Sequence, residues 1–74
     1  MNDEINRLRN QRIAKYLCDN KIKSHLMRKD GIFFNGFIKE IGGDFVIIED
    51  REDGLQLVFF IEIKDLKEYV EVSE

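Results

Sequence analysis

The sequence predicts a mainly β domain in which one N-terminal α-helix precedes five short antiparallel strands that bend strongly into a small barrel. Glycine-containing turns near residues 31, 42 and 54 separate short runs of β-branched and aromatic residues, which is typical of a β meander. A charged, amphipathic segment occupies the first 20 residues. We therefore expect one domain over residues 1–74, with a helix over 1–20 and a five-stranded barrel over 21–74.

The size of the chain favours self-association. With 74 residues it can build only one core, and domains this small usually need disulfides, metals or oligomerisation for stability. Cys18 is the only cysteine and His25 the only histidine, which excludes an intrachain disulfide and a Cys/His zinc site. The acidic turn 50–54 lacks the spacing of a calcium loop. We expect no metal and no cofactor, and oligomerisation remains as the stabilising route.

The composition also argues against several classes of function. No signal peptide or apolar run of membrane-spanning length is visible, so we expect a cytoplasmic protein without a membrane partner. His25 has no Ser, Cys or second His at motif spacing, and no glycine loop for phosphates is present. We therefore expect no enzyme and no small-molecule substrate.

The predicted helix is basic although the whole chain is acidic. The net charge is −3, but residues 1–29 carry +5 and residues 30–74 carry −8. This asymmetry would suit a face that attracts phosphates, a head-to-tail contact between subunits, or an ordinary solvated surface. The helix should cover one open end of the barrel through an apolar stripe. The stripe comprises Ile5, Leu8, Ile13, Tyr16 and Leu17.

The middle of the chain reads as three consecutive strands. Residues 21–29 alternate, with Ser24 and Leu26 on one side, and Asp30-Gly31 is a strong hairpin-turn signal before the strand over 32–41. Gly36 lies in the middle of that strand, where glycine marks a bulge or a sharp bend. Residues 42–44 form a second turn, and a β-branched run over 45–48 forms the third strand.

The last two strands are predicted over 56–61 and 66–72. The fourth has almost no polar face, so we expect Leu57, Phe59 and Ile61 inside the barrel, the residues between them outside, and a partner covering the exposed side. The fifth should place Leu66, Val70 and Val72 on one side. Candidate subunit-interface residues are Leu57, Val58, Phe59, Phe60, Ile61, Leu66, Tyr69 and Val70.

One pattern of glycines and apolar residues resembles the first motif of the Sm-like (LSm/Hfq-type) family of small RNA-associated ring proteins. It is carried by Leu26, Lys29-Asp30-Gly31, Gly36, Ile38 and Val46–Asp50. The resemblance implies a strongly bent SH3-like barrel. It also implies a homo-oligomeric ring, closed by pairing of the fourth strand with the fifth strand of the next subunit, and single-stranded RNA as a partner.

The chain departs from the family where the uridine pocket would lie. Ile61-Glu62 stands near the family's Arg-Gly pair and Asp44-Phe45 near its Asn; a carboxylate there would repel phosphate, whereas Phe45 can stack on a base. The alternative to RNA binding is an SH3-like protein-interaction or scaffold module. Candidate RNA-binding residues are Arg7, Arg9, Arg12, Lys15, Asp44, Phe45 and Lys64.

Overall fold

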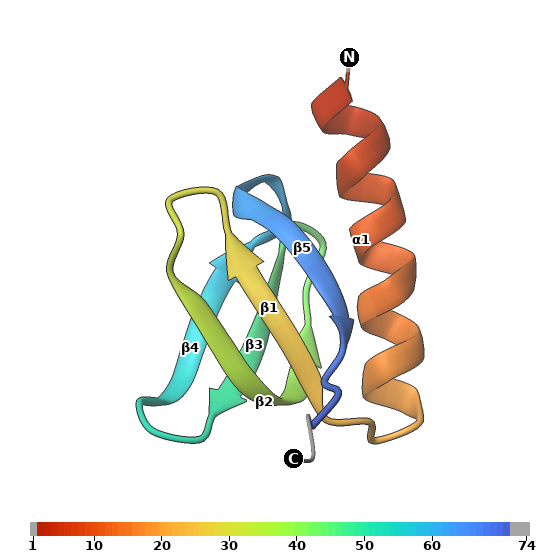
Figure 1. Ribbon diagram of the computed structural model, residues 1–74. Helices are drawn as coiled ribbons and strands as arrows, with labels where there is room; N and C mark the ends of the chain where they lie inside the picture. The colour runs from red at the N-terminus through yellow and green to blue at the C-terminus, as the bar shows by residue number, and fades with distance from the viewer. Residues whose placement is uncertain (1, 72–74) are drawn as a thin grey trace.

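A computed structural model describes residues 2–71 as one helix and a single five-stranded antiparallel sheet (Figure 1). The strand order is β4-β3-β2-β1-β5, so β4 and β5 are the two edges. This confirms the predicted helix followed by five antiparallel strands. The elements are α1 (Asn2–Asp19), β1 (Ser24–Arg28), β2 (Phe33–Ile41), β3 (Phe45–Asp50), β4 (Gly54–Phe59), a 3-10 turn η1 (Phe60–Glu62) and β5 (Ile63–Glu68).

The first hairpin and the bend of β2 follow the predicted glycines. Gly31 has φ +94°, and the Asp30 carboxylate accepts the N–H of Ile32 at 3.0 Å, which fixes the turn between β1 and β2. A Cβ at Gly36 would collide with the carbonyl oxygen of Glu49 on β3. Only glycine lets the two backbones approach this closely, and β2 can therefore curve around the core.

The core is filled by the inward side chains of the five strands and closed by α1. Ala14 and Leu17 of α1 are buried, with Ile13 and Cys18 packed beside them. The strands and η1 contribute Leu26, Phe34, Ile38, Val46, Ile48, Val58, Phe60, Ile63 and Leu66.

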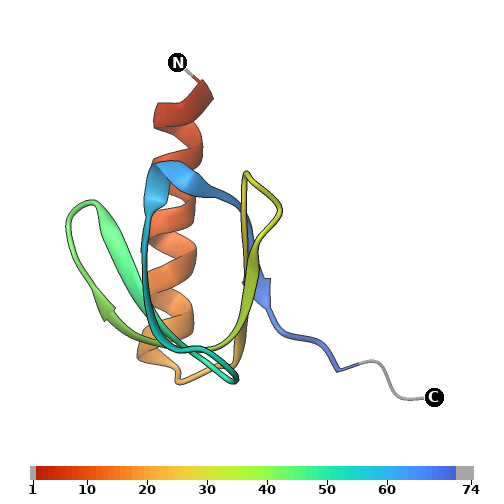
Figure 2. The same cartoon turned by 90° about the vertical axis from the view of Figure 1, so that its left-hand side faces the viewer.

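Only the carboxyl-terminal half of α1 covers the barrel, so the predicted apolar stripe was partly wrong. Ile5, Leu8 and Tyr16 are exposed, whereas Asn10 and Ala14 face the barrel. Figures 1 and 2 show the first turns of α1 extending beyond the barrel. The small side chain of Ala14 allows close approach of the helix, and the barrel is too short to cover the whole helix.

The predicted orientation of β4 was wrong. Val58 and Phe60 are fully buried, whereas Leu57, Phe59 and Ile61 are exposed. Val58 pairs with Val46 of β3, so both point into the core. Every residue from 57 to 61 is apolar. Alternation alone therefore could not decide whether the odd-numbered or the even-numbered residues face inward.

The predicted bounds of β5 were also wrong. β5 begins at Ile63 and ends at Glu68, and Val70 is largely exposed beyond it, while Val72 lies outside the described residues. A register irregularity opposite Met27 and Arg28 lets Ile63 and Leu66, three positions apart, both face inward. Among the predicted interface residues, the side chains of Val58, Phe60 and Leu66 are thus buried in the core of their own chain and are not exposed to a second subunit.

No helix among the described residues has the length and apolar character needed to cross a membrane.

Candidate nucleic-acid interface

The four basic residues predicted on the helix do not form a single stripe. At 100° per residue, Arg7, Arg9, Arg12 and Lys15 are spread over about half of the circumference of α1. Arg7 pairs with Glu4 at 2.6 Å and Lys15 with Asp19 at 3.2 Å. Within the described residues neither Arg9 nor Arg12 makes an ion pair, but Arg9 donates to Asn6 Oδ1 at 2.9 Å, so the charge of Arg12 is the most available of the four.

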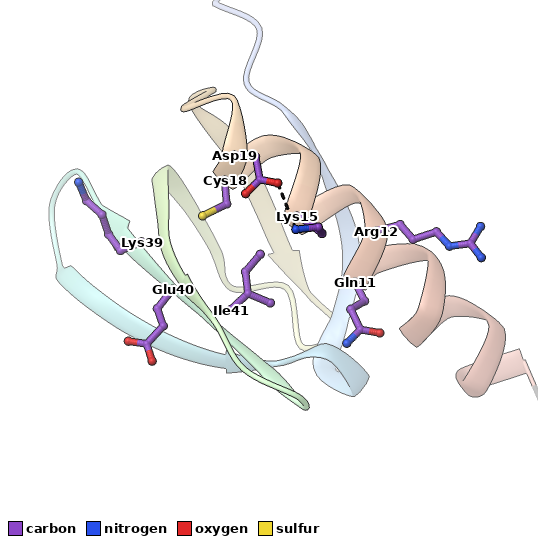
Figure 3. Close-up of a pocket in the computed structure, with 8 residues that line it drawn as sticks. All are labelled: Gln11, Arg12, Lys15, Cys18, Asp19, Lys39, Glu40 and Ile41. Atoms are coloured by element: carbon purple, nitrogen blue, oxygen red, sulfur yellow. Dashed lines mark ion pairs between the residues drawn. The ribbon is translucent and has the colours of Figure 1, made fainter.

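Two of these cations line a groove between α1 and the end of β2 (Figure 3). Arg12 and Lys15 lie on its helical wall and Lys39 on the opposite strand, and the groove has a volume of about 520 Å³. Lys39 also pairs with Glu49 at 3.4 Å. Its other lining residues are Gln11, Cys18, Asp19, Glu40 and Ile41.

Sequence reasoning missed Lys39 as a member of this groove. Residue 39 lies at a register irregularity between Ile38 and Glu40, where β2 bulges against β3. The bulge changes the direction of side chains at the end of the strand. Alternation along β2 gives no signal for such a bulge, so the pairing of α1 with this position could not be read from the sequence.

Asp44 and Phe45 lie together at the turn between β2 and β3, as predicted. The carbonyl of Asp44 accepts the N–H of Phe60 at 2.8 Å, which joins this turn to η1. The ring of Phe45 covers Gly42, where a Cβ would collide with it, and Phe45 pairs with Phe59 across the sheet. Phe45 is half-buried, so part of its ring remains open for stacking.

Lys64 is exposed, but it lies in β5 and not in a turn between the strands predicted over 56–61 and 66–72. The chain reverses earlier, through η1. The structure thus places Asp44 and Phe45 beside η1, and gathers Arg12 and Lys15 at the groove of α1.

The outward face of β1 and β2 carries a second polar and aromatic cluster that was not predicted. His25 Nδ1 lies 2.6 Å from Asn35 Oδ1, and the His25 and Phe33 rings are 5.6 Å apart. Nearby, Lys23 Nζ lies 4.5 Å from the centre of the Tyr69 ring, a cation–π contact. The hairpin turn at Asp30-Gly31 fixes the register of β1 and β2, in which His25 pairs with Asn35. The sequence therefore contained a signal that these two side chains lie together.

Two shallow cavities flank this cluster, with volumes of about 220 and 450 Å³, and both include Asn35 and Tyr69. Asp50 lines the smaller one. Burial raises the pKa of Asp50, but hydrogen bonds from the N–H groups of Asp53, Asn35, Glu52 and Arg51 outweigh it and hold this pKa below its ordinary value. The carboxylate of Asp50 thereby ties the β3–β4 turn to β2.

The comparisons with known proteins identify the fold. No protein-family model and no curated protein sequence matches the chain. Among solved structures, it is similar to a crystal structure of Hfq, described as a pleiotropic translational regulator. The TM-score is 0.67 with 14% sequence identity, and the match covers 77% of this chain and 93% of that chain. The fold is Sm-like.

The departure from the resembled motif at Glu62 has a structural explanation. A Glu62 carboxylate oxygen accepts the N–H of Phe59 at 3.2 Å, its other oxygen lies 3.9 Å from Arg28, and its carbonyl accepts the N–H of Lys29 at 2.8 Å. Glu62 therefore holds η1 against the β1–β2 turn. Phe60 is buried and Ile61 offers no charge, so η1 contributes no cation for phosphate.

Proposed function

We propose that this protein assembles into a homo-oligomeric Sm-like ring that binds single-stranded RNA without catalysis. The observation that carries the proposal is the Sm-like sheet, whose edge strands β4 and β5 each have one side without a partner in the part of the chain that the structure describes. β4 also presents exposed Leu55, Leu57 and Phe59. Because an open apolar edge strand favours association, pairing β4 with β5 of a second copy would cover both edges. The proposal keeps the expectation of a cytoplasmic protein.

RNA contact in this proposal comes from cations repeated around the ring. Each copy supplies Arg12 from α1 and Lys39 across the groove, and Arg9 lies one turn before Arg12, so individually weak phosphate contacts sum over the copies. Phe45, at the turn beside η1, offers a partly open ring to a base. Asp44, in that turn, and Lys64, in β5, remain candidate residues of the proposed site.

The first test is a fluorescence-anisotropy titration against short U-rich and A-rich RNAs at low and physiological salt. Binding should weaken steeply with added salt because phosphate contacts release counterions. Arg9→Glu/Arg12→Glu should lower the affinity for every RNA, whereas Phe45→Ala should lower it with a base preference. The pair Lys21→Glu/Arg51→Glu makes the same charge change outside α1 and is the matched control.

The competing function is a scaffold without RNA binding, and the charge pairing favours it. Arg7, Lys15 and Lys39 are each paired with a carboxylate, and Glu62 occupies the place of the family's arginine. An intact ring that binds none of the RNAs at low salt would select the scaffold. Salt-sensitive binding that is equal in the α1 variant and its control would keep RNA binding and reject this site.

Light scattering tests the assembly independently. A stable assembly of several subunits at micromolar concentration is expected. A monomer under these conditions would reject the ring and leave a lone SH3-like interaction module.

A further inference from the structure

The amino-terminal half of α1 has an apolar surface that its own barrel does not cover. Ile5 is 61% exposed and Leu8, one turn later, is 45% exposed. With half-buried Ile13 they line a groove of about 360 Å³, and Arg9 and Arg12 complete its walls. Figures 1 and 2 show these turns extending past the barrel. An apolar groove flanked by cations is a candidate contact surface.

The position of α1 determines what can reach this groove. α1 packs against β5, the strand whose outer edge has no partner among the described residues. In the ring proposed above, that edge receives β4 of the adjacent copy, and the present inference rests on that ring. A strand added to β5 would therefore lie near α1 of the receiving copy.

The direction of pairing selects one end of the added strand. Antiparallel pairing, which joins all strands of this sheet, sets the carboxyl-terminal end of β4 against the amino-terminal end of β5. That end of β4 carries Leu57 and Phe59, which are 51% and 46% exposed. β5 begins directly after η1, which itself packs against α1, and α1 continues beyond this level (Figure 1).

The charges around the two surfaces are complementary. Arg9 and Arg12 flank the groove on α1. Beside Phe59, the Glu62 carboxylate accepts the Phe59 N–H, and the backbone carbonyl of the exposed residue Asp44 accepts the N–H of Phe60, so the backbones of two acidic residues lie at the apolar end of β4. An apolar pair edged by carboxylates suits an apolar groove edged by guanidinium groups.

We propose that the groove formed by Ile5, Leu8 and Ile13 of one copy holds Leu57 and Phe59 of the adjacent copy. Arg9 then faces the acids beside Phe59 of that copy, whereas Arg12 also lines the groove toward Lys39 and stays available to phosphate. The occupant is thus a second copy of this chain, and the amino-terminal half of α1 acts as a clasp across the β4–β5 junction. This gives a role to the turns of α1 that leave their own barrel.

Cross-linking between differently tagged chains tests the contact. Both chains carry Cys18→Ser; one also carries Leu8→Cys and the other Phe59→Cys, so a disulfide that joins the two tags must link two copies. Mixed assembly followed by oxidation should yield this heterodisulfide in a major fraction. The matched control replaces Leu8→Cys by Tyr16→Cys, because Tyr16 is exposed on the same helix outside the groove.

A stability measurement separates this inference from the proposed ring. Ile5→Ser/Leu8→Ser should raise the concentration at which the assembly half-dissociates roughly tenfold, because apolar area is no longer buried, while Tyr16→Ser leaves it unchanged. Circular dichroism checks that the helix persists. An intact ring with no heterodisulfide and no effect of the double substitution rejects the clasp alone. A wild-type monomer at micromolar concentration rejects the ring and the clasp together.

Discussion

The central strands and the edge strands of this sheet differ in how their backbone hydrogen-bonding groups are paired and how their apolar side chains are covered. In β2 and β3, Gly36 permits the close crossing and Asp50 binds backbone N–H groups of β2 and of the following turn, so the bend is fixed by groups within the chain. In β4 and β5, one edge of each strand has no partner among residues 2–71, and large apolar residues of β4 face outward. The central strands satisfy these groups within the chain, whereas the edges leave groups that the proposed second copy would cover.

The largest expected effect lies at the edge, where two adjacent phenylalanines have opposite roles. Phe60→Ala should lower the free energy of unfolding by about 3–5 kcal/mol, because Phe60 is fully buried. Phe59→Ala should cost the protomer less than about 1 kcal/mol and weaken assembly instead. Urea unfolding at two protein concentrations distinguishes them. The Phe60 effect should not depend on concentration, and equal losses for both variants at the lower concentration would contradict this division.

In the centre, Gly36→Ala should lower the free energy of unfolding by about 1–3 kcal/mol or more. The added methyl would collide with the backbone of Glu49, which cannot move without opening the β2–β3 pairing. Gly43→Ala is the matched control, since a Cβ there meets nothing within 4 Å and its effect should stay within about 0.5 kcal/mol. Equal urea midpoints for the two variants would show that the bend does not need glycine.

The sequence predicted the centre better than the edges, and the reason is physical. Asp30-Gly31 and Gly36 act through local backbone geometry, so their turn and bend are visible in the residues themselves. Phe59 and Phe60 are identical in type, and only the pairing with β3 decides which one is buried. The predicted strands over 56–61 and 66–72 leave Ile63 between them, and the bulge that turns it inward depends on β1.

The candidate site was predicted in the same uneven way. The cations of α1 were visible from composition, but their distribution around the helix and the carboxylates that pair with them depend on side-chain geometry. Lys39 joins the groove only because a bulge brings it opposite α1. The cluster around His25 and Asn35 follows from hairpin register, yet a lone histidine on a strand gave no chemical reason to examine it.

The carboxylate of Asp50 predicts a pH dependence for the centre of the fold. Its pKa is below the ordinary value in the folded state, so the unfolded chain binds the proton more readily. The stabilisation is therefore present above the unfolded pKa of about 3.9 and is lost as the pH falls through the folded pKa. Asp50→Asn should cost about 1 kcal/mol at pH 7, and the difference from wild type should shrink below pH 4.

Urea unfolding between pH 3 and pH 7 measures this effect, with Asp53→Asn as the control from the same turn. Asp53 carries an equivalent charge, but the hydrogen bonds to the β3–β4 turn end on the Asp50 carboxylate. The control should keep the pH dependence of the wild type. A gap between wild type and Asp50→Asn that stays constant down to pH 3 would remove Asp50 as its source.

The smallest expected effect lies where the chain leaves the β5 edge and returns to β1. The Tyr69 N–H donates to the Lys23 carbonyl at 2.8 Å, and Lys23 Nζ lies 4.5 Å from the centre of the Tyr69 ring. A cation–π contact at an exposed site contributes about 0.5–1 kcal/mol. Tyr69→Leu and Lys23→Gln should each lower the free energy of unfolding by that amount, and the double variant by little more than either. Fully additive losses in this double-mutant cycle would mean that the backbone bond alone holds residue 69 to β1.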